Sequence, residues 1–395
     1  MIEKNVGDAM DFTELLETDR SGLAQRDRSL IIRRVDAIPI AVPLLKPMKM
    51  AGSVVRSADN LLVRIEADDG TVGWGEAASA PMMTGDTRAA MVSAVREHLA
   101  PVLVGRDARH RAALVRDCAA ALYGNTGARS AVEVALHDLL GRALGVSFAD
   151  LLGGALRQVV RPMWLLGNPT LEEDVAEALA RIEQGTGFFK LKVGSKSLAR
   201  DIETALALRE AVGPDIRLCA DANGGLETQA AIAFLDGAAA ARIEFLEQPV
   251  AAGNLGGMAR IARGSIPIGA DEGIHELADI AAHAAAGVLG VSLKLIKLGG
   301  PAAMLQAMML CEQSDLRINV AAKVGETGLG AAITTHMACL APNADWGVSL
   351  TNVYLADDIL DRPFLPTDGQ VSLPPGPGSG VQVDEAAVAR LRVAA

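Results

Sequence analysis

FFKLKV (residues 188–193) is a short apolar run that contains Lys190 and Lys192 near its end. It decides the fold because similar runs recur along the chain. Runs of this kind spaced roughly 20–30 residues apart have the period of a βα unit, and seven or eight such units close into a parallel barrel with its active site at the carboxyl ends of the strands. The other seven runs are MWLLG (163–167), IRLCAD (216–221), IEFLEQP (243–249), IPIGADE (266–272), GVSLKL (290–295), LRINVA (316–321) and ADWGVSL (344–350).

An open doubly wound sheet is the alternative that the same alternation allows. Such a sheet usually carries a GxGxxG turn after its first strand, and the sequence contains none. We therefore predict an α/β fold built on the barrel.

The segment before the barrel predicts a smaller α+β domain. Alternating runs at 30–43 and 60–78 predict antiparallel strands, with a hairpin turn at Asp69-Gly70. Apolar residues at helical spacing then predict helices between about 86 and 152. We expect residues 1–29 to be a mobile extension, 30–155 a capping domain, 156–350 the barrel and 351–395 a segment that returns to the cap.

Composition excludes several classes of partner. The formal charge is −11 and aromatic residues make up 3% of the chain, which disfavours nucleic acid and anionic membrane surfaces. No stretch reaches the roughly 18 consecutive apolar residues of a membrane-spanning helix. The four cysteines lack the spacing of metal ligands, which favours a reducing compartment. We expect a cytoplasmic protein that acts on a small molecule.

Five of the runs end in charged residues that recur at intervals of 29, 26, 24 and 23 residues: Lys192, Asp221, Glu247, Asp271 and Lys294. One charge per βα unit places all five at the same rim of the barrel. Alone, each carboxylate is explained as a helix cap or a partner for a loop arginine. Together, carboxylates from three adjacent strands supply the hard oxygen ligands that Mg²⁺ or Mn²⁺ prefers.

The two lysines of the rim lie on strands two and six, which face each other across an eight-stranded barrel. Lys192 and Lys294 would therefore approach a central ligand from opposite sides. Lys190 shares the strand and the face of Lys192, and we expect its like charge to disfavour the protonated form of Lys192. A KxK pair on its own is more simply explained by lysines that extend from a strand end to solvent.

These motifs together resemble the enolase superfamily, in the muconate-lactonizing subgroup of the mandelate racemase/muconate lactonizing enzyme family. The similarity covers about residues 31–390 and is carried by KLKVG (190–194), DAN (221–223), EQP (247–249), ADE (270–272), KLIKLGG (294–300) and the helical segment 124–145. The resemblance implies a modified TIM-type (β/α)7β barrel with an α+β cap and one Mg²⁺ or Mn²⁺ held by Asp221, Glu247 and Asp271. It also implies that Lys192 and Lys294 are the catalytic bases or acids.

The resemblance implies an isomerase that acts on a metal-bound carboxylate through an enolate-type intermediate. A muconate cycloisomerase uses one lysine for the proton, whereas a racemase or epimerase of N-acylamino acids, dipeptides or betaines uses both. A noncatalytic binding barrel is the remote alternative. The family also implies a homo-oligomer, a dimer or an octamer.

Substrate contacts are expected from the cap and from the seventh strand. Lys49 and Arg56, in the segment 43–60 between two cap strands, are candidates for holding a distal carboxylate. Asn223 and Lys297 are expected beside the substrate, and Glu326 is expected to orient a base or act as an acid. Lys323 is a weaker candidate for a rim contact. Gly273 and Thr327 depart from the subgroup's usual Ser and Gly and are expected to change the pocket.

Overall fold

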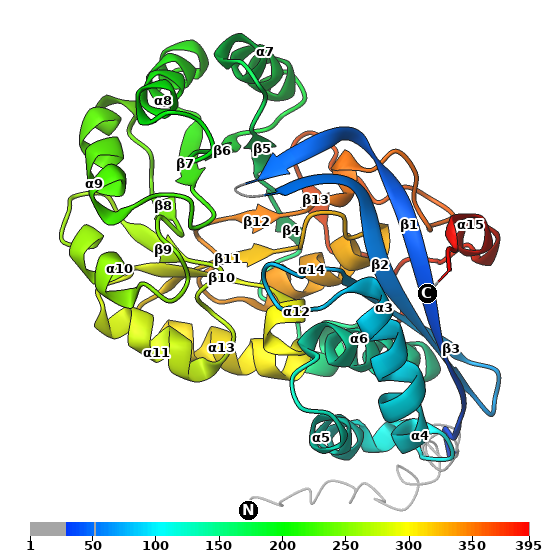
Figure 1. Cartoon of the computed structure of the whole chain (residues 1–395). Helices are drawn as coiled ribbons and strands as arrows, with labels where there is room; N and C mark the ends of the chain where they lie inside the picture. Colours follow the sequence, from blue (N-terminus) through cyan, green and yellow to red (C-terminus); the bar gives the residue numbers. More distant parts are fainter. Residues whose placement is uncertain (1–28, 51–52, 395) are drawn as a thin grey trace, which may run out of the picture.

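The computed structural model describes residues 29–50 and 53–394, and it has two parts: an eight-stranded parallel barrel and a sheet-and-helix cap beside it (Figure 1). Lys49, Met50 and Ser53 are described by their backbone alone. The predicted extension at 1–29 lies almost wholly outside the described residues. In the part of the chain that is described, no helix is long and apolar enough to cross a membrane.

The cap sheet is antiparallel and has the order β1-β2-β3, formed by β1 (Ile32–Met50), β2 (Ser53–Ala67) and β3 (Val72–Ala78). The predicted turn at Asp69-Gly70 joins β2 to β3, and Gly70 takes a φ of +86° that favours glycine. The expectation that residues 43–60 lie between two cap strands is wrong. Strand β1 extends to Met50 and β2 begins at Ser53, and the two strands pair there, with an irregularity between Pro43 and Met48.

Helices cover one face of the cap sheet. They are α3 (Arg88–Ser93), a π-helical turn (Ala94–Leu99), α4 (Ala100–Leu103), α5 (Arg111–Ala121) and α6 (Thr126–Leu144). Helix α6 lies against β3 at backbone contact, because a Cβ atom on Gly75 would be 2.0 Å from the carbonyl oxygen of Ala131. Glycine in β3 is therefore what allows the helix to approach the sheet this closely.

Helix α6 also ties the cap to the rest of the chain through two buried carboxylates. Glu133 accepts a hydrogen bond from the backbone N–H of Ala302 (2.8 Å) at the start of a barrel helix. Asp138 accepts hydrogen bonds from the backbone N–H groups of Trp74 (2.8 Å) in β3 and Ser379 (2.6 Å) in the C-terminal segment. One helix thus holds the sheet, the barrel and the C-terminal segment together.

Glu133 predicts a measurable dependence of stability on pH. Burial raises the pKa of Glu133 to about 7, against the hydrogen bond from Ala302. Between the unfolded value of 4.5 and about 7 the folded protein holds a proton on Glu133 that the unfolded chain releases, so the free energy of unfolding falls as pH rises through this window. Glu133→Gln should remove about 2 kcal/mol of this fall, measured by urea unfolding at pH 5 and 7.5. Glu210→Gln, at an exposed position, is the control. An equal fall in the free energy of unfolding between pH 5 and 7.5 for wild type and Glu133→Gln would contradict the prediction.

The barrel strands lie within the eight predicted runs, and their order in the sheet follows the sequence. A parallel bridge between Pro162 and Val348 joins the two edges of the sheet and brings the barrel close to closure. The strands are β5 (Trp164–Leu166), β6 (Phe188–Lys192), β7 (Arg217–Asp221), β8 (Leu246–Glu247), β9 (Ile268–Ala270), β10 (Gly290–Leu293), β11 (Arg317–Ala321) and β12 (Val348–Ser349). The predicted barrel is confirmed.

Seven helices connect these strands, which is the (β/α)7β arrangement. They are α7 (Leu171–Ile182), α8 (Leu198–Val212), α9 (Thr228–Gly237), α10 (Leu255–Ile261), α11 (Leu277–Ala285), α13 (Pro301–Gln313) and α14 (Gly328–Leu340), with a short α12 (Leu295–Leu298) before α13. Capping residues start several of them: the side chain of Thr170 accepts from the N–H of Glu173 at the start of α7, and Ser197 does the same for α8.

Aromatic side chains fill the amino-terminal end of the barrel. The rings of Phe245 and Trp346 stack with centroids 4.0 Å apart, and they form one buried cluster with Met163, Phe188 and Cys219. Four of these five residues precede or begin their strands, so the apolar filling occupies the end opposite the charged rim. The charged side chains of the barrel interior lie instead at the carboxyl ends of the strands.

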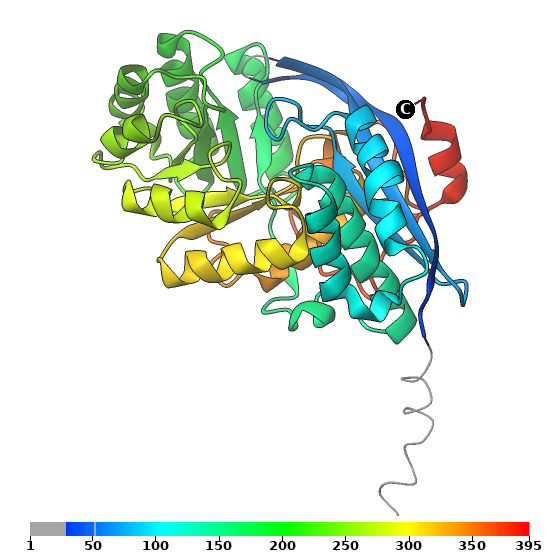
Figure 2. The ribbon, with the colours of Figure 1, turned by 60° about the horizontal axis from the view of Figure 1, so that its bottom comes forward.

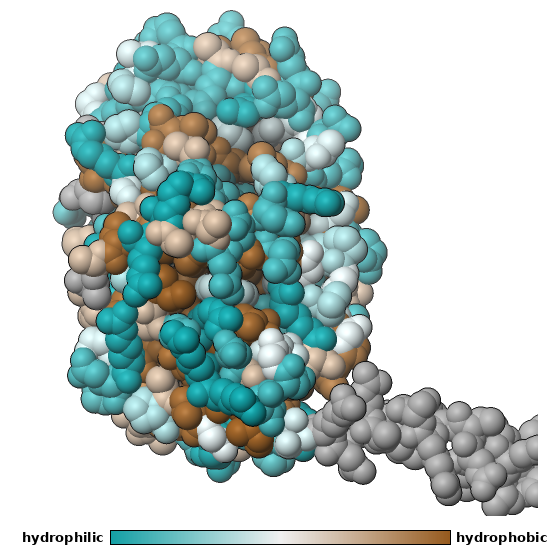
Figure 3. Space-filling model, turned by 90° about the vertical axis from the view of Figure 1, so that its right-hand side faces the viewer, coloured by the Kyte–Doolittle hydropathy of each residue, from teal (hydrophilic) through white to brown (hydrophobic). Residues whose placement is uncertain are grey.

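The C-terminal segment returns along the barrel to the cap. Strand β13 (Val371–Ser372) pairs with β4 (Val159–Val160), and helix α15 (Glu385–Leu391) lies beside the long cap strands (Figure 2). An ion pair of 3.1 Å joins Arg64 of β2 to Glu385 of α15. The face of the molecule turned toward the viewer in Figure 3 is mostly hydrophilic, with hydrophobic surface visible between the polar side chains.

Candidate active site

A cavity of about 560 Å³ opens at the carboxyl ends of the barrel strands, beneath the cap. The barrel contributes charged side chains from several strand ends. The cap contributes residues 54–60 of β2 and the segment 79–83 that follows β3. The charged barrel residues that line the cavity are Lys190, Lys192, Asp221, Glu247, Asp271, Glu272, Lys294 and Lys323. The structure therefore brings the five predicted rim residues to one cavity.

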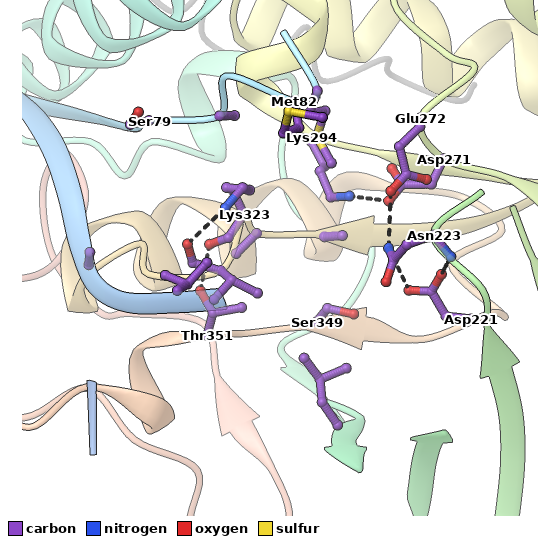
Figure 4. A pocket seen from close by; sticks show the side chains of 18 of the residues that line it. Ser79, Met82, Asp221, Asn223, Asp271, Glu272, Lys294, Lys323, Ser349 and Thr351 are labelled. Carbon is purple, nitrogen blue, oxygen red and sulfur yellow. Dashed lines mark hydrogen bonds and ion pairs between the residues drawn. The ribbon is translucent and has the colours of Figure 1, made fainter. Parts of the chain in front are cut away.

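Lys192 and Asp221 are direct neighbours in the register of β6 and β7. The ammonium group of Lys192 donates to Asp221 Oδ2 (2.5 Å) and to Asn223 Oδ1 (2.9 Å). Burial opposes ionisation of Asp221, but Lys192 and Lys190 outweigh it and lower the pKa of Asp221. Asn223 also donates to Glu272 Oε1 (3.0 Å), which places the predicted substrate-contact residue on the cavity wall (Figure 4).

Lys190 has a carboxylate partner of its own. Its ammonium group forms a buried ion pair with Glu247, whose other oxygen accepts from Ser292 Oγ (2.8 Å). Burial alone would lower the pKa of Lys190, but Glu247 and Asp221 outweigh it and raise the pKa. Glu247 therefore balances the charge of Lys190, and the expected effect of Lys190 on the protonated form of Lys192 stays a prediction.

Asp271 lies between two lysines. Lys294, which lines the cavity, donates to Asp271 Oδ2 (Figure 4), and the buried Lys297 donates to Asp271 Oδ1 (2.7 Å). Both lower the pKa of Asp271 against the effect of burial. Lys297 is 0% exposed and does not line the cavity. The expected substrate contact of Lys297 is thus corrected to a structural one, in which it holds Asp271 in position.

Lys192 and Lys294 come from opposite walls of the barrel. Lys192 ends β6, the second strand of the barrel, and Lys294 directly follows β10, the sixth. Both line the same cavity. A ligand bound between them would have one ammonium group on each side.

Three carboxylates in the cavity have the chemistry of ligands for a divalent cation. Asp221, Glu247 and Asp271 end or follow three adjacent strands, are each 2% exposed and line the cavity together. Burial raises the pKa of Glu247, and the carboxylates of Asp221 and Asp271 add to this against Lys190, so the three acids are close enough to repel one another. Within residues 29–50 and 53–394 no three acidic, thiol or imidazole groups are drawn together tightly enough to hold a metal, since lysines pair with each of these acids. Their placement and hard oxygen chemistry nonetheless fit Mg²⁺ or Mn²⁺.

The seventh strand contributes Lys323, and Glu326 lies behind it. Lys323 lines the cavity, whereas Glu326 is 7% exposed, does not line the cavity and accepts a hydrogen bond from the backbone N–H of Lys323 (3.0 Å). Burial raises the pKa of Glu326 to about 8. Glu326 therefore holds the backbone of Lys323 in place, and its expected role in orienting a base or acting as an acid stays a prediction.

The cap covers the cavity with mostly apolar side chains. Val54 and Val55 of β2 and Met82 and Met83 lie on this side, and Arg56 is the cap cation that lines it. The side chain of Lys49 lies outside the described residues.

The two departures from the subgroup pattern do not reach the cavity. Thr327 caps α14, and its side chain accepts from the N–H of Leu329. Gly273 lies against His283, where a Cβ atom would be 2.7 Å from Nε2. Neither residue lines the cavity, so the expectation that they change the pocket directly is wrong.

A buried hydrogen-bond network surrounds Glu76 of β3, and the sequence patterns did not predict it. Its carboxylate accepts from the side chain of Asn60 (2.6 Å), from the N–H (3.0 Å) and hydroxyl (2.7 Å) of Thr327, and from the N–H of Gly330 (3.0 Å). Glu76 belongs to the cap and Thr327 begins α14 of the barrel, so the network fixes the cap against the seventh strand's loop. The signal in the sequence was a single glutamate in VGWGEAA, an otherwise apolar and glycine-rich strand.

Comparison with known proteins gives a consistent result over most of the chain. Residues 34–153 match the model "Mandelate racemase / muconate lactonizing enzyme, N-terminal domain", and residues 173–387 match "Enolase C-terminal domain-like". The chain is 31% identical over 367 residues to muconate cycloisomerase 1 of Rhodococcus opacus, covering 91% of this chain and 98% of that protein. It is 30% identical over 356 residues to L-Ala-D/L-Glu epimerase of Bacillus subtilis, covering 89% and 96%. The fold matches the crystal structure of muconate lactonizing enzyme from Pseudomonas fluorescens complexed with muconolactone, with a TM-score of 0.89 and 27% identity over 93% of this chain and 100% of that one.

Proposed function

Because the chain belongs to the mandelate racemase/muconate lactonizing enzyme family of the enolase superfamily, we propose that it is a muconate cycloisomerase-like isomerase that acts on a carboxylate through an enolate-type intermediate. The observation that carries this proposal is the cavity itself. Lys192 and Lys294 approach it from opposite walls, and three buried carboxylates lie between them. Relatives with cycloisomerase activity in their names support the same conclusion.

Asp221, Glu247 and Asp271 would hold one Mg²⁺ or Mn²⁺ in this cavity. When bound, the cation would stabilise the negative charge that develops on the substrate carboxylate as the reaction proceeds. Lys190 and Lys297 keep Glu247 and Asp271 ionised and oriented through their buried contacts. Asn223 links Asp221 to Glu272 and so fixes the wall next to Lys192.

Lys192 is the principal acid or base. In cycloisomerisation the substrate closes a carbon–oxygen bond at its double bond, and an ammonium group then donates a proton to the carbon next to the carboxylate. The ammonium group of Lys192 is oriented by Asp221 and Asn223, and that of Lys294 by Asp271. The apolar cap residues above the cavity exclude water from the proton-transfer site.

The second candidate is a racemase or epimerase of N-acylamino acids, dipeptides or betaines. The opposed positions of Lys192 and Lys294 favour it, because one lysine removes a proton from one face of a carbon while the other returns it to the opposite face. The similarity to L-Ala-D/L-Glu epimerase points the same way.

Incubation in D₂O with Mg²⁺ distinguishes these reactions. With cis,cis-muconate we expect a lactone that carries one deuterium at the protonated carbon, observed by NMR. Racemisation would instead show deuterium exchange with loss of optical activity in an N-acylamino acid or dipeptide. The same incubation with a chelator is the control. No lactone from muconate, and no exchange in any of these carboxylates, would overturn the proposed function.

Assembly and location complete the proposal. By its family we infer a homo-oligomer, a dimer or an octamer, which size-exclusion chromatography with light scattering tests. Cys118, Cys219, Cys311 and Cys339 are buried and form no disulfide. This supports a reducing compartment, and we infer a cytoplasmic location.

A further inference from the structure

Lys323 differs from the other lysines of the cavity because no carboxylate of the described residues pairs with its ammonium group. Lys190, Lys192 and Lys294 each form an ion pair with Glu247, Asp221 and Asp271 respectively. Among the residues that the structure describes, no carboxylate oxygen lies within ion-pair distance of the Lys323 ammonium group. Its one hydrogen bond is a long one, 3.3 Å, to the carbonyl oxygen of Val324.

A half-buried ammonium group without an ion-paired carboxylate is costly in a folded protein. Burial and the nearby charges of Lys294 and Lys192 lower the pKa of Lys323 to about 8, against the opposite effect of Glu326 and Asp271. Arg56 also lines the cavity without an ion-pair partner in the described chain, but its position on β2 is exposed and water solvates it. Of the cations that line the cavity, Lys323 would therefore be stabilised most by an ion pair with an anionic group of a bound ligand.

The backbone of Lys323 is held on both sides. Its N–H donates to Glu326 Oε1 (3.0 Å), and its carbonyl oxygen accepts from the hydroxyl of Thr351 (2.8 Å). Glu326 is in turn next to Thr327, which the Glu76 network fixes to the cap. The side chain of Lys323 is thus presented to the cavity from a fixed point, as a recognition residue requires.

The position of Lys323 lies across the cavity from the metal-site carboxylates. It follows β11, the seventh barrel strand, while Asp221, Glu247 and Asp271 come from the third, fourth and fifth. Figure 4 shows Lys323 on the side of the cavity away from Asp221 and Asn223. A ligand whose reacting carboxylate binds at the third to fifth strands extends toward Lys323, beneath the apolar Val54, Val55 and Met82 of the cap.

We propose that Lys323 binds a second carboxylate at the far end of the substrate, so that the enzyme selects dicarboxylates with an apolar middle section. The proposal rests on the proposed function, because that function places the reacting carboxylate at Asp221, Glu247 and Asp271. It also disfavours substrates with a cationic far end, because Lys323 would repel them and because Asp221, Glu247 and Asp271 already pair with lysines.

Binding of two unreactive probes tests this assignment without turnover. Adipate carries two carboxylates and hexanoate carries one on the same six-carbon chain. By isothermal titration calorimetry with saturating Mg²⁺, we expect adipate to bind wild type about 10- to 100-fold more tightly than hexanoate. Lys323→Met should abolish this preference and change hexanoate affinity less than about twofold, while Lys323→Arg should keep most of it.

Lys46→Met is the matched control, because Lys46 is an exposed lysine paired with Glu177 and does not line the cavity. It should leave both affinities unchanged. The assignment would be overturned if folded Lys323→Met protein lost affinity for adipate and hexanoate equally, or if wild type showed no preference for adipate. If muconate gives no lactone but the adipate preference still depends on Lys323, the proposed reaction fails and the dicarboxylate site stands.

Discussion

Lys294→Met is expected to lower kcat by about 10²- to 10⁴-fold while the protein stays folded. The structure explains why folding survives. Asp271, which loses Lys294, keeps Lys297 as a buried ion-pair partner at 2.7 Å. Lys192→Met should cause the larger loss, because Lys192 is the proposed principal acid or base. This variant should also stay folded, because Asp221 keeps a hydrogen bond from the backbone N–H of Asn223 (2.9 Å). Steady-state kinetics with muconate and far-UV circular dichroism measure the two effects separately.

Lys190→Met tests a lysine whose proposed role is to stabilise the buried Glu247, not to transfer a proton. Its removal leaves Glu247 buried with Ser292 as its remaining hydrogen-bond donor, so we expect a loss of about 3–5 kcal/mol in the free energy of unfolding. The variants of Lys192 and Lys294, the two proposed catalytic lysines, also distinguish between the candidate reactions. A racemase lacking one lysine still exchanges the proton of one enantiomer, whereas a cycloisomerase depends chiefly on one lysine. Wild-type kcat in both Lys192→Met and Lys294→Met would show that neither side chain transfers the proton.

Glu247→Gln is expected to weaken Mg²⁺ binding by at least about 100-fold and to remove metal-dependent turnover. Glu247 lies on the central strand of the three that carry the proposed ligands, between Asp221 and Asp271. An amide in its place supplies a neutral oxygen, and it no longer neutralises Lys190, whose positive charge then opposes a cation. Calorimetric titration with Mg²⁺ measures affinity, and the rise in Tm on adding Mg²⁺ measures binding independently of activity.

Glu244→Gln provides the matched control for this substitution. Glu244 lies three residues earlier and pairs with Arg217 at the exposed opposite end of the strand, at 2.6 Å. Its replacement should change neither Mg²⁺ affinity nor turnover. An unchanged Mg²⁺-induced rise in Tm in Glu247→Gln would mean that the metal binds elsewhere, and full activity of chelated wild type would remove the metal from the mechanism.

The sequence predicted the barrel well because its signals are local and repeated. Each apolar run, such as FFKLKV at 188–193, contains one observed strand, and the recurring charges at their ends placed Lys192, Asp221, Glu247, Asp271 and Lys294 at one cavity. Parallel strands of one barrel end at the same rim, so position in the chain was sufficient to predict this convergence. The hairpin at Asp69-Gly70 was predictable for a similar reason, since the turn residues adjoin the strands they connect.

The pairing of side chains was not predictable in this way. Spacing does not reveal that Lys190 meets Glu247 or that Lys297 lies beneath Asp271, because both contacts depend on how side chains turn within the packed barrel. The Glu76 network joins residues more than 250 positions apart in the chain. Residues 43–60 were not predicted as strand because prolines, a glycine and charges interrupt the alternation there, whereas pairing across the sheet extends both strands into this segment.

The division of the cavity wall between two structural units has an evolutionary consequence. Acids and amines for proton transfer sit on the barrel, whereas Val54, Val55, Met82 and Met83 belong to a separately folded layer. Mutations in that layer therefore alter which molecules fit while leaving the reactive groups untouched. Lys323 is the exception: as a barrel residue with a proposed role in selectivity, it lies in the same unit as the reactive groups, so a lineage changing to substrates without a distal anion would have to replace it.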